Sequence, residues 1–150
     1  MESFPALNFP TFNFRIGGPS GQRTVWDELR GCWLVLTPEE WVRRHLIRYL
    51  SEFCGASPRL ISQECPVRLG ELRQRADVVV FGRDARPLLL AECKSPDVKI
   101  DASTYAQAVR YNSVIGARYI LVTNGLDHKI YESSGDGNYA PLKEFPDLNI

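Results

Sequence analysis

Hydrophobic and polar positions follow two different periods along the chain, and these periods predict helices and strands. Between residues 42 and 53, apolar side chains recur every three or four positions, which is the spacing of one buried helix face. Thr37 can cap the start of this helix, with Pro38 as its first residue and Glu40 as the acid of a capping box. Gly55 is placed to end the helix near residue 54.

Extended segments follow this helix. Residues 60–69 partly alternate apolar with polar side chains, and Pro66 among them indicates an edge strand or a bulge. Two apolar runs at 74–81 and 87–93 are separated by a short polar segment, which predicts a hairpin of two central strands. The remaining expected elements are a second helix, a buried strand at 119–125, and a strand at 128–133. Asp101, Ser103 or Thr104 can cap the second helix, which runs to about residue 115, where Gly116 ends it.

The two ends of the chain lack such periods. Residues 1–24 combine prolines and glycines with scattered phenylalanines, which predicts an extended arm whose aromatic side chains dock on the body. Residues 135–150 predict an irregular tail, and we expect a single domain over residues 25–150. The order of helix, three strands, helix and two strands predicts an α/β fold with a mixed sheet.

Composition fits one globular domain and narrows the function classes. The chain has 150 residues, of which 44% are hydrophobic, enough for a single core. Its formal net charge is zero, so any DNA binding must come from local patches. No apolar run approaches the roughly 18 residues of a membrane span, and no secretion signal is seen, so we expect a cytoplasmic protein without membrane contact. The four cysteines are widely spaced, which argues against a zinc site and against a disulfide framework.

Three ionisable residues interrupt the two predicted central strands. Asp77 lies within the first strand, and Glu92 and Lys94 lie at the end of the second, where apolar side chains would be expected. Because strand side chains alternate, Glu92 and Lys94 share one face, and a hairpin can bring Asp77 to that face as well. Cys93 should face the opposite side as a core residue. Two carboxylates and an ammonium are thus expected to converge.

Such a cluster suits the cleavage of a phosphodiester. Magnesium prefers carboxylate and water oxygens, and Asp77 and Glu92 can bind it together with the backbone carbonyl of Cys93. Manganese is expected to substitute for magnesium. The cation polarises the phosphate and activates the attacking water, while Lys94 can orient that water or stabilise the charge that develops on the phosphate.

The second predicted helix adds three candidates for DNA binding. Gln107, Arg110 and Tyr111 are spaced to lie on one helix face. The first two can bind phosphate oxygens, and Tyr111 can pack against a sugar or a base. The alternative is a solvated polar face without a partner.

Polar residues of the first helix leave alternatives open. Glu39 lies on the apolar face and can add an acid to the metal site, or it can simply complement the helix dipole, whereas Glu40 points away. His45 is interpreted as a packed helix residue rather than a base. Three arginines form either a patch that meets DNA or a solvated face: Arg43, Arg44 and Arg48.

The segments RADVVVF, LLLAECKSP and QAVRYN resemble the PD-(D/E)XK nuclease superfamily, and most closely the N-terminal nuclease domain of type I restriction enzyme R subunits. The resemblance runs from about Thr37 to Glu132 and implies a restriction-endonuclease-like mixed sheet flanked by helices, with an αβββαβ core. Ala76 stands where a proline often precedes the first acid. The implied roles are magnesium binding for Asp77 and Glu92, catalysis for Lys94, and DNA handling for Gln107, Arg110 and Tyr111.

The function that this resemblance implies is a magnesium-dependent DNA endonuclease of a restriction, defence or repair system. The alternative is a non-cleaving DNA-binding or assembly module that keeps the nuclease fold. The chain has no Gly-x-x-x-x-Gly-Lys-[Ser/Thr] loop, so we expect no ATP-driven motor within it. Expected partners are DNA, a helicase, methyltransferase or specificity subunit, and a second copy of the chain.

Overall fold

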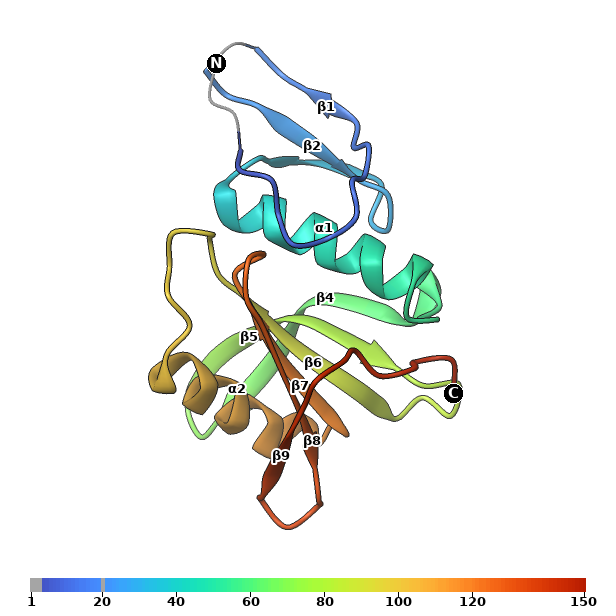
Figure 1. The fold of residues 1–150 in the computed structure, drawn as a ribbon, viewed down its shortest axis with the longest axis vertical. Coiled ribbons are helices and arrows are strands. Elements are labelled where there is room, and N and C mark those ends of the chain that lie inside the picture. Colours follow the sequence, from blue (N-terminus) through green and yellow to red (C-terminus); the bar gives the residue numbers. More distant parts are fainter. Residues whose placement is uncertain (1–3, 20) are drawn as a thin grey trace.

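A computed structural model describes residues 4–19 and 21–150, and Figure 1 shows that these residues form two sheets with a helix between them. The small sheet consists of β1 (Ile16–Gly17), β2 (Thr24–Asp27) and β3 (Cys32–Val35), and α1 (Pro38–Glu52) separates it from the large sheet. A short 3-10 turn, η1 (Pro58–Leu60), leads into the large sheet. The six strands of the large sheet are β4 (Ile61–Leu69), β5 (Leu72–Phe81), β6 (Pro87–Cys93), β7 (Tyr119–Thr123), β8 (His128–Ser133) and β9 (Tyr139–Leu142).

The large sheet is mixed, as the sequence predicts. Its strands lie in the order in which they occur in the chain, and every neighbouring pair is antiparallel except β6 and β7. The crossover between those two parallel strands is α2 (Ala102–Ile115). Within the described ranges, no helix is both long and apolar enough to cross a lipid bilayer.

The core consists of two apolar layers, one on each face of the large sheet. On one face, Leu46 and Leu50 of α1 pack in a cluster with Leu89 of β6. On the other face, Ala108 of α2 belongs to a second cluster with Ile120 of β7. Helices therefore cover both faces of the central strands, which explains why β6 and β7 read as continuous apolar runs.

Helix α1 begins and ends where the sequence predicts, with two local differences. The Thr37 hydroxyl accepts a hydrogen bond from the Glu40 amide at 3.0 Å. The Glu40 carboxylate does not complete a capping box, because it binds Arg43 and Arg44 instead. Phe53, expected on the buried helix face, is 59% exposed, since it follows the last helical turn.

The expected signals of α2 are confirmed at both ends. Asp101 is its N-cap and forms a reciprocal capping box with Thr104. Gly116 follows the last turn with a φ of 75°, in the left-handed region that favours glycine.

The N-terminal arm docks on α1, as its aromatic residues predict. The rings of Phe9, Phe12 and Phe14 lie 6.2, 5.9 and 4.8 Å from the ring of His45. His45 is buried, as expected for a packed helix residue, and its Nδ1 lies 2.8 Å from the carbonyl oxygen of Trp41. The expected arm also included residues 1–3 and 20, which lie outside the described residues.

The expectation of little regular structure at the two ends is partly wrong. Strand β1 and the first residue of β2 lie within residues 1–24, so the arm continues into the small sheet. Strand β9 lies within the expected irregular tail and pairs with β8. Tyr139 anchors it, because its hydroxyl accepts a hydrogen bond from Asn112 Nδ2 of α2 at 2.9 Å. Pro141 is tolerated there because β9 is an edge strand.

Candidate functional site

The β5–β6 hairpin brings Asp77 and Glu92 together. Val78 pairs with Ala91 in the antiparallel ladder, which puts the preceding Asp77 beside Glu92 on the neighbouring strand. Asp77 is further held by the backbone of β6, since its Oδ2 accepts a hydrogen bond from the Cys93 amide at 2.7 Å. Cys93 itself is 1% exposed and belongs to the apolar cluster beneath α1, as its predicted core position requires.

Glu92 is the most unusual member of the site. Its side chain is 4% exposed, and its Oε1 is buried without a hydrogen-bond partner among the described residues. Burial, together with the neighbouring Asp77 carboxylate, raises the pKa of Glu92 to about 9. A buried acceptor without a partner is unfavourable, and a bound cation would satisfy it.

Lys94 is held by a chain of side-chain hydrogen bonds that begins on α2. Its Nζ donates to Gln107 Oε1 at 3.3 Å, and Gln107 Nε2 donates to the Tyr111 hydroxyl at 2.9 Å. The Tyr111 hydroxyl in turn donates to Gln74 Oε1 of β5 at 3.1 Å. At the other end, the Lys94 amide donates to the Thr123 carbonyl of β7 at 2.8 Å. The ammonium group is therefore held by α2, and the backbone that carries it is held by β7.

Two of the residues expected to bind DNA, Gln107 and Tyr111, are instead part of this chain of hydrogen bonds. Tyr111 is 4% exposed, so its ring is not available to pack on a sugar or a base in this structure. Gln107 and Tyr111 instead connect Lys94 to β5. Arg110 is the exposed member of the three, and it has no carboxylate partner among residues 4–19 and 21–150.

A cavity of about 530 Å³ opens at the N-terminus of α1, beside the site. Glu39 and Asp77 both line it, as do Glu64 and Asp97. Burial and the charge of Asp77 raise the pKa of Glu39, and the charge of Lys94 acts on it in the opposite direction. The structure thus places Glu39 beside Asp77. Glu40, expected to point away, lines the same cavity, but its carboxylate is bound by Arg43 and Arg44.

The acidic residues do not form a complete cage for a metal ion. In the described part of the chain, no three His, Cys, Asp or Glu side chains meet closely enough to hold one. Magnesium, however, usually keeps several waters and takes one or two protein carboxylates together with phosphate oxygens of the substrate. Asp77 and Glu92 fit that ligand set, and the unpartnered Glu92 oxygen is the feature that fits it best.

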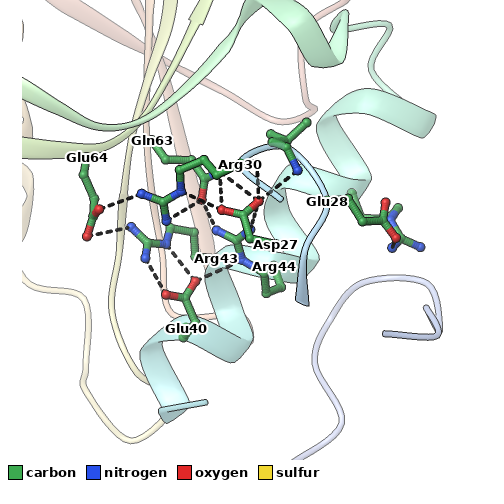
Figure 2. Close-up of polar contacts among 10 residues, drawn as sticks. Asp27, Glu28, Arg30, Glu40, Arg43, Arg44, Gln63 and Glu64 are labelled. Atoms are coloured by element: carbon green, nitrogen blue, oxygen red, sulfur yellow. Dashed lines mark hydrogen bonds and ion pairs between the residues drawn. The ribbon is translucent and has the colours of Figure 1, made fainter. Parts of the chain in front are cut away.

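The arginines of α1 do not form a basic patch, which corrects both interpretations of them. Figure 2 shows Arg43 and Arg44 within a network of ion pairs. Arg43 also lines the cavity beside Asp77. Arg44 is 4% exposed, and its Nη1 lies 2.9 Å from Asp27 Oδ1. Arg43 contacts Glu40, and its Nη1 lies 3.7 Å from Glu64 Oε1. Arg48 is also paired, with Glu28 at 3.1 Å.

Sequence reasoning missed the residues that complete this network. Asp27 is fully buried at the end of β2 and also binds Arg30 and Gln63. The sequence could have indicated only the pair of Asp27 and Arg30, which are three residues apart. Gln63 lies 36 residues from Asp27, so no local pattern connects them. Glu64, which binds Arg30, has a φ of 51° in β4, directly after the residue that pairs with Val78.

Comparison with known proteins gives two matches that agree with each other. A family model described as type I restriction enzyme R protein N terminus (HSDR_N) matches residues 38–146. A fragment described as an HsdR subunit of a type I restriction enzyme from Vibrio vulnificus YJ016 has a similar fold, with a TM-score of 0.56 at 20% sequence identity. That match covers 75% of this chain and 24% of the Vibrio chain.

No curated protein is significantly similar in sequence. The matched family segment nevertheless spans every strand of the large sheet and both α-helices. The chain belongs to the type I restriction enzyme R protein N-terminus family and is similar to the N-terminal nuclease domain of R subunits.

Proposed function

We propose that this chain hydrolyses phosphodiester bonds of DNA with magnesium at the site formed by Asp77, Glu92 and Lys94. Membership of the R protein N-terminus family indicates a nuclease role in a restriction system. The observation that carries the finer proposal is the buried, unpartnered oxygen of Glu92 beside Asp77, at the end of the strand that leads to Lys94. This arrangement is unfavourable in a purely structural strand.

The carboxylates of Asp77 and Glu92 would hold magnesium. Glu39 lines the same cavity as Asp77 and would contribute through one of the waters that the ion keeps. The Cys93 amide keeps Asp77 turned toward β6. When bound, magnesium supplies positive charge that polarises the phosphate and favours ionisation of the attacking water. Manganese, which accepts the same oxygen ligands, would substitute for it.

Lys94 would act on the phosphate directly. Its ammonium group is held beside the carboxylates by Gln107, so it is positioned before DNA binds. A preorganised positive charge stabilises the charge that develops on the phosphate in the transition state. Gln107 and Tyr111 are positioning residues in this proposal, and Arg110 is the residue of α2 that is free to contact a phosphate.

Partner subunits would deliver the DNA. A motor, a methyltransferase or a specificity subunit of a restriction system would supply this step. A second copy of the chain would serve to cut the opposite DNA strand.

Cleavage of a supercoiled plasmid in the presence of magnesium tests the proposal. Asp77→Asn and Lys94→Ala should each lower the cleavage rate by about 100-fold or more, because each removes a group that acts on the reacting phosphate. Asp97→Asn is the matched control, since Asp97 lines the same cavity but is exposed and lies beyond β6. The control should cleave at close to the wild-type rate.

A protein that binds DNA but cuts none would contradict the proposal, provided that magnesium, manganese and the partner subunits have all been supplied. That result would leave the alternative, a DNA-binding or assembly module that has the nuclease fold without its chemistry.

A further inference from the structure

The distal half of the β4–β5 hairpin projects beyond the rest of the sheet. Strand β6 pairs with β5 only from Val78 onward, whereas β4 and β5 remain paired out to Leu69 and Leu72. In this distal half the two strands form a ribbon, and α2 covers one of its faces (Figure 1). Val67 and Ala76 are buried on that covered face.

The opposite face of the ribbon carries three arginines. Arg68 pairs with Arg73 across the two strands, and Arg75 pairs with Pro66, so these side chains alternate with the buried Val67 and Ala76. All three arginines are exposed. A cavity of about 440 Å³ lies at this part of the hairpin, and the three arginines help to line it.

These arginines are not neutralised by the protein. Among the described residues, none of the three has a carboxylate within ion-pair distance, whereas other arginines do, among them Arg30, Arg43, Arg44, Arg48 and Arg118. The charge of Arg75 does help to lower the pKa of Glu64, but the Glu64 carboxylate is already bound by Arg30 at 2.7 Å. In a chain of zero net charge, three adjacent free arginines are a local positive surface.

The arginine face leads directly to the proposed site. Arg73, Arg75 and Asp77 occupy every second position of β5. Along the strand, Arg75 is therefore about 7 Å from Asp77, and Arg73 is about 14 Å from it. Glu64 lines the same cavity as Asp77, and the charge of Arg75 helps to lower the pKa of its carboxyl group. The nearest of the three arginines, Arg75, therefore lies two positions from Asp77 on the same strand.

We propose that Arg68, Arg73 and Arg75 bind the phosphate backbone of duplex DNA and guide it along β5 into the site at Asp77. The inference rests on the proposed function for its choice of DNA as the partner. Arginine is suited to phosphate because its planar guanidinium group donates paired hydrogen bonds. Such contacts would set the position of the duplex without reading its sequence.

The test is DNA affinity measured by fluorescence anisotropy in EDTA, so that neither cleavage nor a metal ion contributes. The probe is a labelled duplex of about 30 base pairs, titrated at several salt concentrations between about 50 and 200 mM. The test variant combines Arg68→Gln, Arg73→Gln and Arg75→Gln. The control variant combines Arg59→Gln, Arg86→Gln and Lys143→Gln, which removes the same charge from exposed positions away from the hairpin.

The hairpin variant should bind about tenfold more weakly or worse, and its slope of log affinity against log salt should be shallower by about 3, because each lost phosphate contact removes about one unit. The control variant should change affinity by less than about threefold. Arg→Lys substitutions at the same three positions should keep the wild-type salt slope, since lysine retains the charge, and should lose only the part of the affinity that comes from paired hydrogen bonds. The loss should be equal on two duplexes of unrelated sequence.

An affinity loss no larger than that of the control variant, or an unchanged salt slope, would overturn the inference. A loss confined to one DNA sequence would overturn it as well, because contacts to phosphates do not depend on the base sequence. Circular dichroism of both variants checks that they are folded. The DNA-binding result and the nuclease result can be told apart. If the hairpin variant binds weakly and the wild-type protein never cleaves, DNA binding by the three arginines is supported and the nuclease chemistry is rejected.

Discussion

Glu92 and Lys94 lie two residues apart on one strand, and their surroundings prepare them for opposite roles. Glu92 is buried beside a second carboxylate, so it retains a proton or binds a cation. Lys94 is half-buried and donates to a neutral amide rather than to a carboxylate, so its charge is not neutralised within the hydrogen-bond chain. Two neighbouring ionisable groups with such different environments are typical of a catalytic pair.

Gln107→Ala should lower the rate of cleavage by about 10- to 100-fold, because Lys94 loses the acceptor that positions it and small misplacements of a reacting group are costly. Single-turnover cleavage with saturating DNA measures this rate, and DNA affinity should change little. Arg110→Ala, on the exposed side of the same helix, is the matched control and should weaken binding instead. If Gln107→Ala weakens DNA binding and leaves the rate of bound DNA unchanged, Gln107 contacts DNA and does not position Lys94.

The sequence was sufficient to bring Asp77 and Glu92 together, because strand alternation and a hairpin determine which side chains share a face. It was not sufficient for Gln107 and Tyr111. Their spacing on the helix is visible in the chain, but the choice between facing DNA and facing Lys94 depends on how α2 packs on β5. Helix periodicity carries no information about that packing partner.

At the scale of elements, α1 links the small sheet to the site. Its Arg44 binds Asp27 of β2 and Glu40 of the same helix, while Arg43, one residue away, shares the site cavity with Asp77. These ion pairs are largely buried, so removing one partner leaves a buried charge without compensation. The position of α1, and with it the position of Glu39, depends on this network.

Arg44→Met should destabilise the protein by about 3 kcal/mol, because the buried Asp27 loses its fully buried cation and keeps only the partly exposed Arg30 as a charged partner. Urea denaturation measures the free energy of unfolding. Arg48→Met is the matched control on the same helix; its partner Glu28 is exposed, so that substitution should cost about 1 kcal/mol or less. Equal costs for the two substitutions would show that the buried network does not stabilise the fold.

The elements that sequence reasoning placed well are those with a strong period or a clear end signal. Both α-helices begin and end within two residues of their expected bounds. The small sheet was missed because its three strands have only two to four residues each, too few to show a period. Strand β9 was missed because it follows a glycine-rich turn and contains a proline, which are signals of irregular structure.

At the scale of the whole molecule, the two sheets should unfold together. The buried network and the aromatic arm join the small sheet to α1, and α1 packs on the large sheet (Figures 1 and 2). All three tryptophans lie in the small sheet and α1, whereas most of the backbone signal in circular dichroism comes from the helices and the large sheet.

Unfolding curves from tryptophan fluorescence and from far-ultraviolet circular dichroism should therefore coincide. Chemical denaturation followed by both probes makes the comparison. An earlier fluorescence transition would mean that the small sheet unfolds on its own and that the network does not couple it to the site.

The most direct test of the central claim is magnesium binding by the chain itself, measured by calorimetry in buffers of different ionisation enthalpy. The pKa of Glu92 is raised to about 9, so at pH 7 this carboxyl group is protonated in the metal-free protein and must lose its proton to bind a cation. We predict that magnesium binding releases close to one proton per chain at pH 7, that the release declines as the pH rises through about 9, and that Glu92→Gln abolishes it. Binding that releases no proton at pH 7, or that is the same in Glu92→Gln and Asp77→Asn as in the wild type, would contradict the assignment of this site.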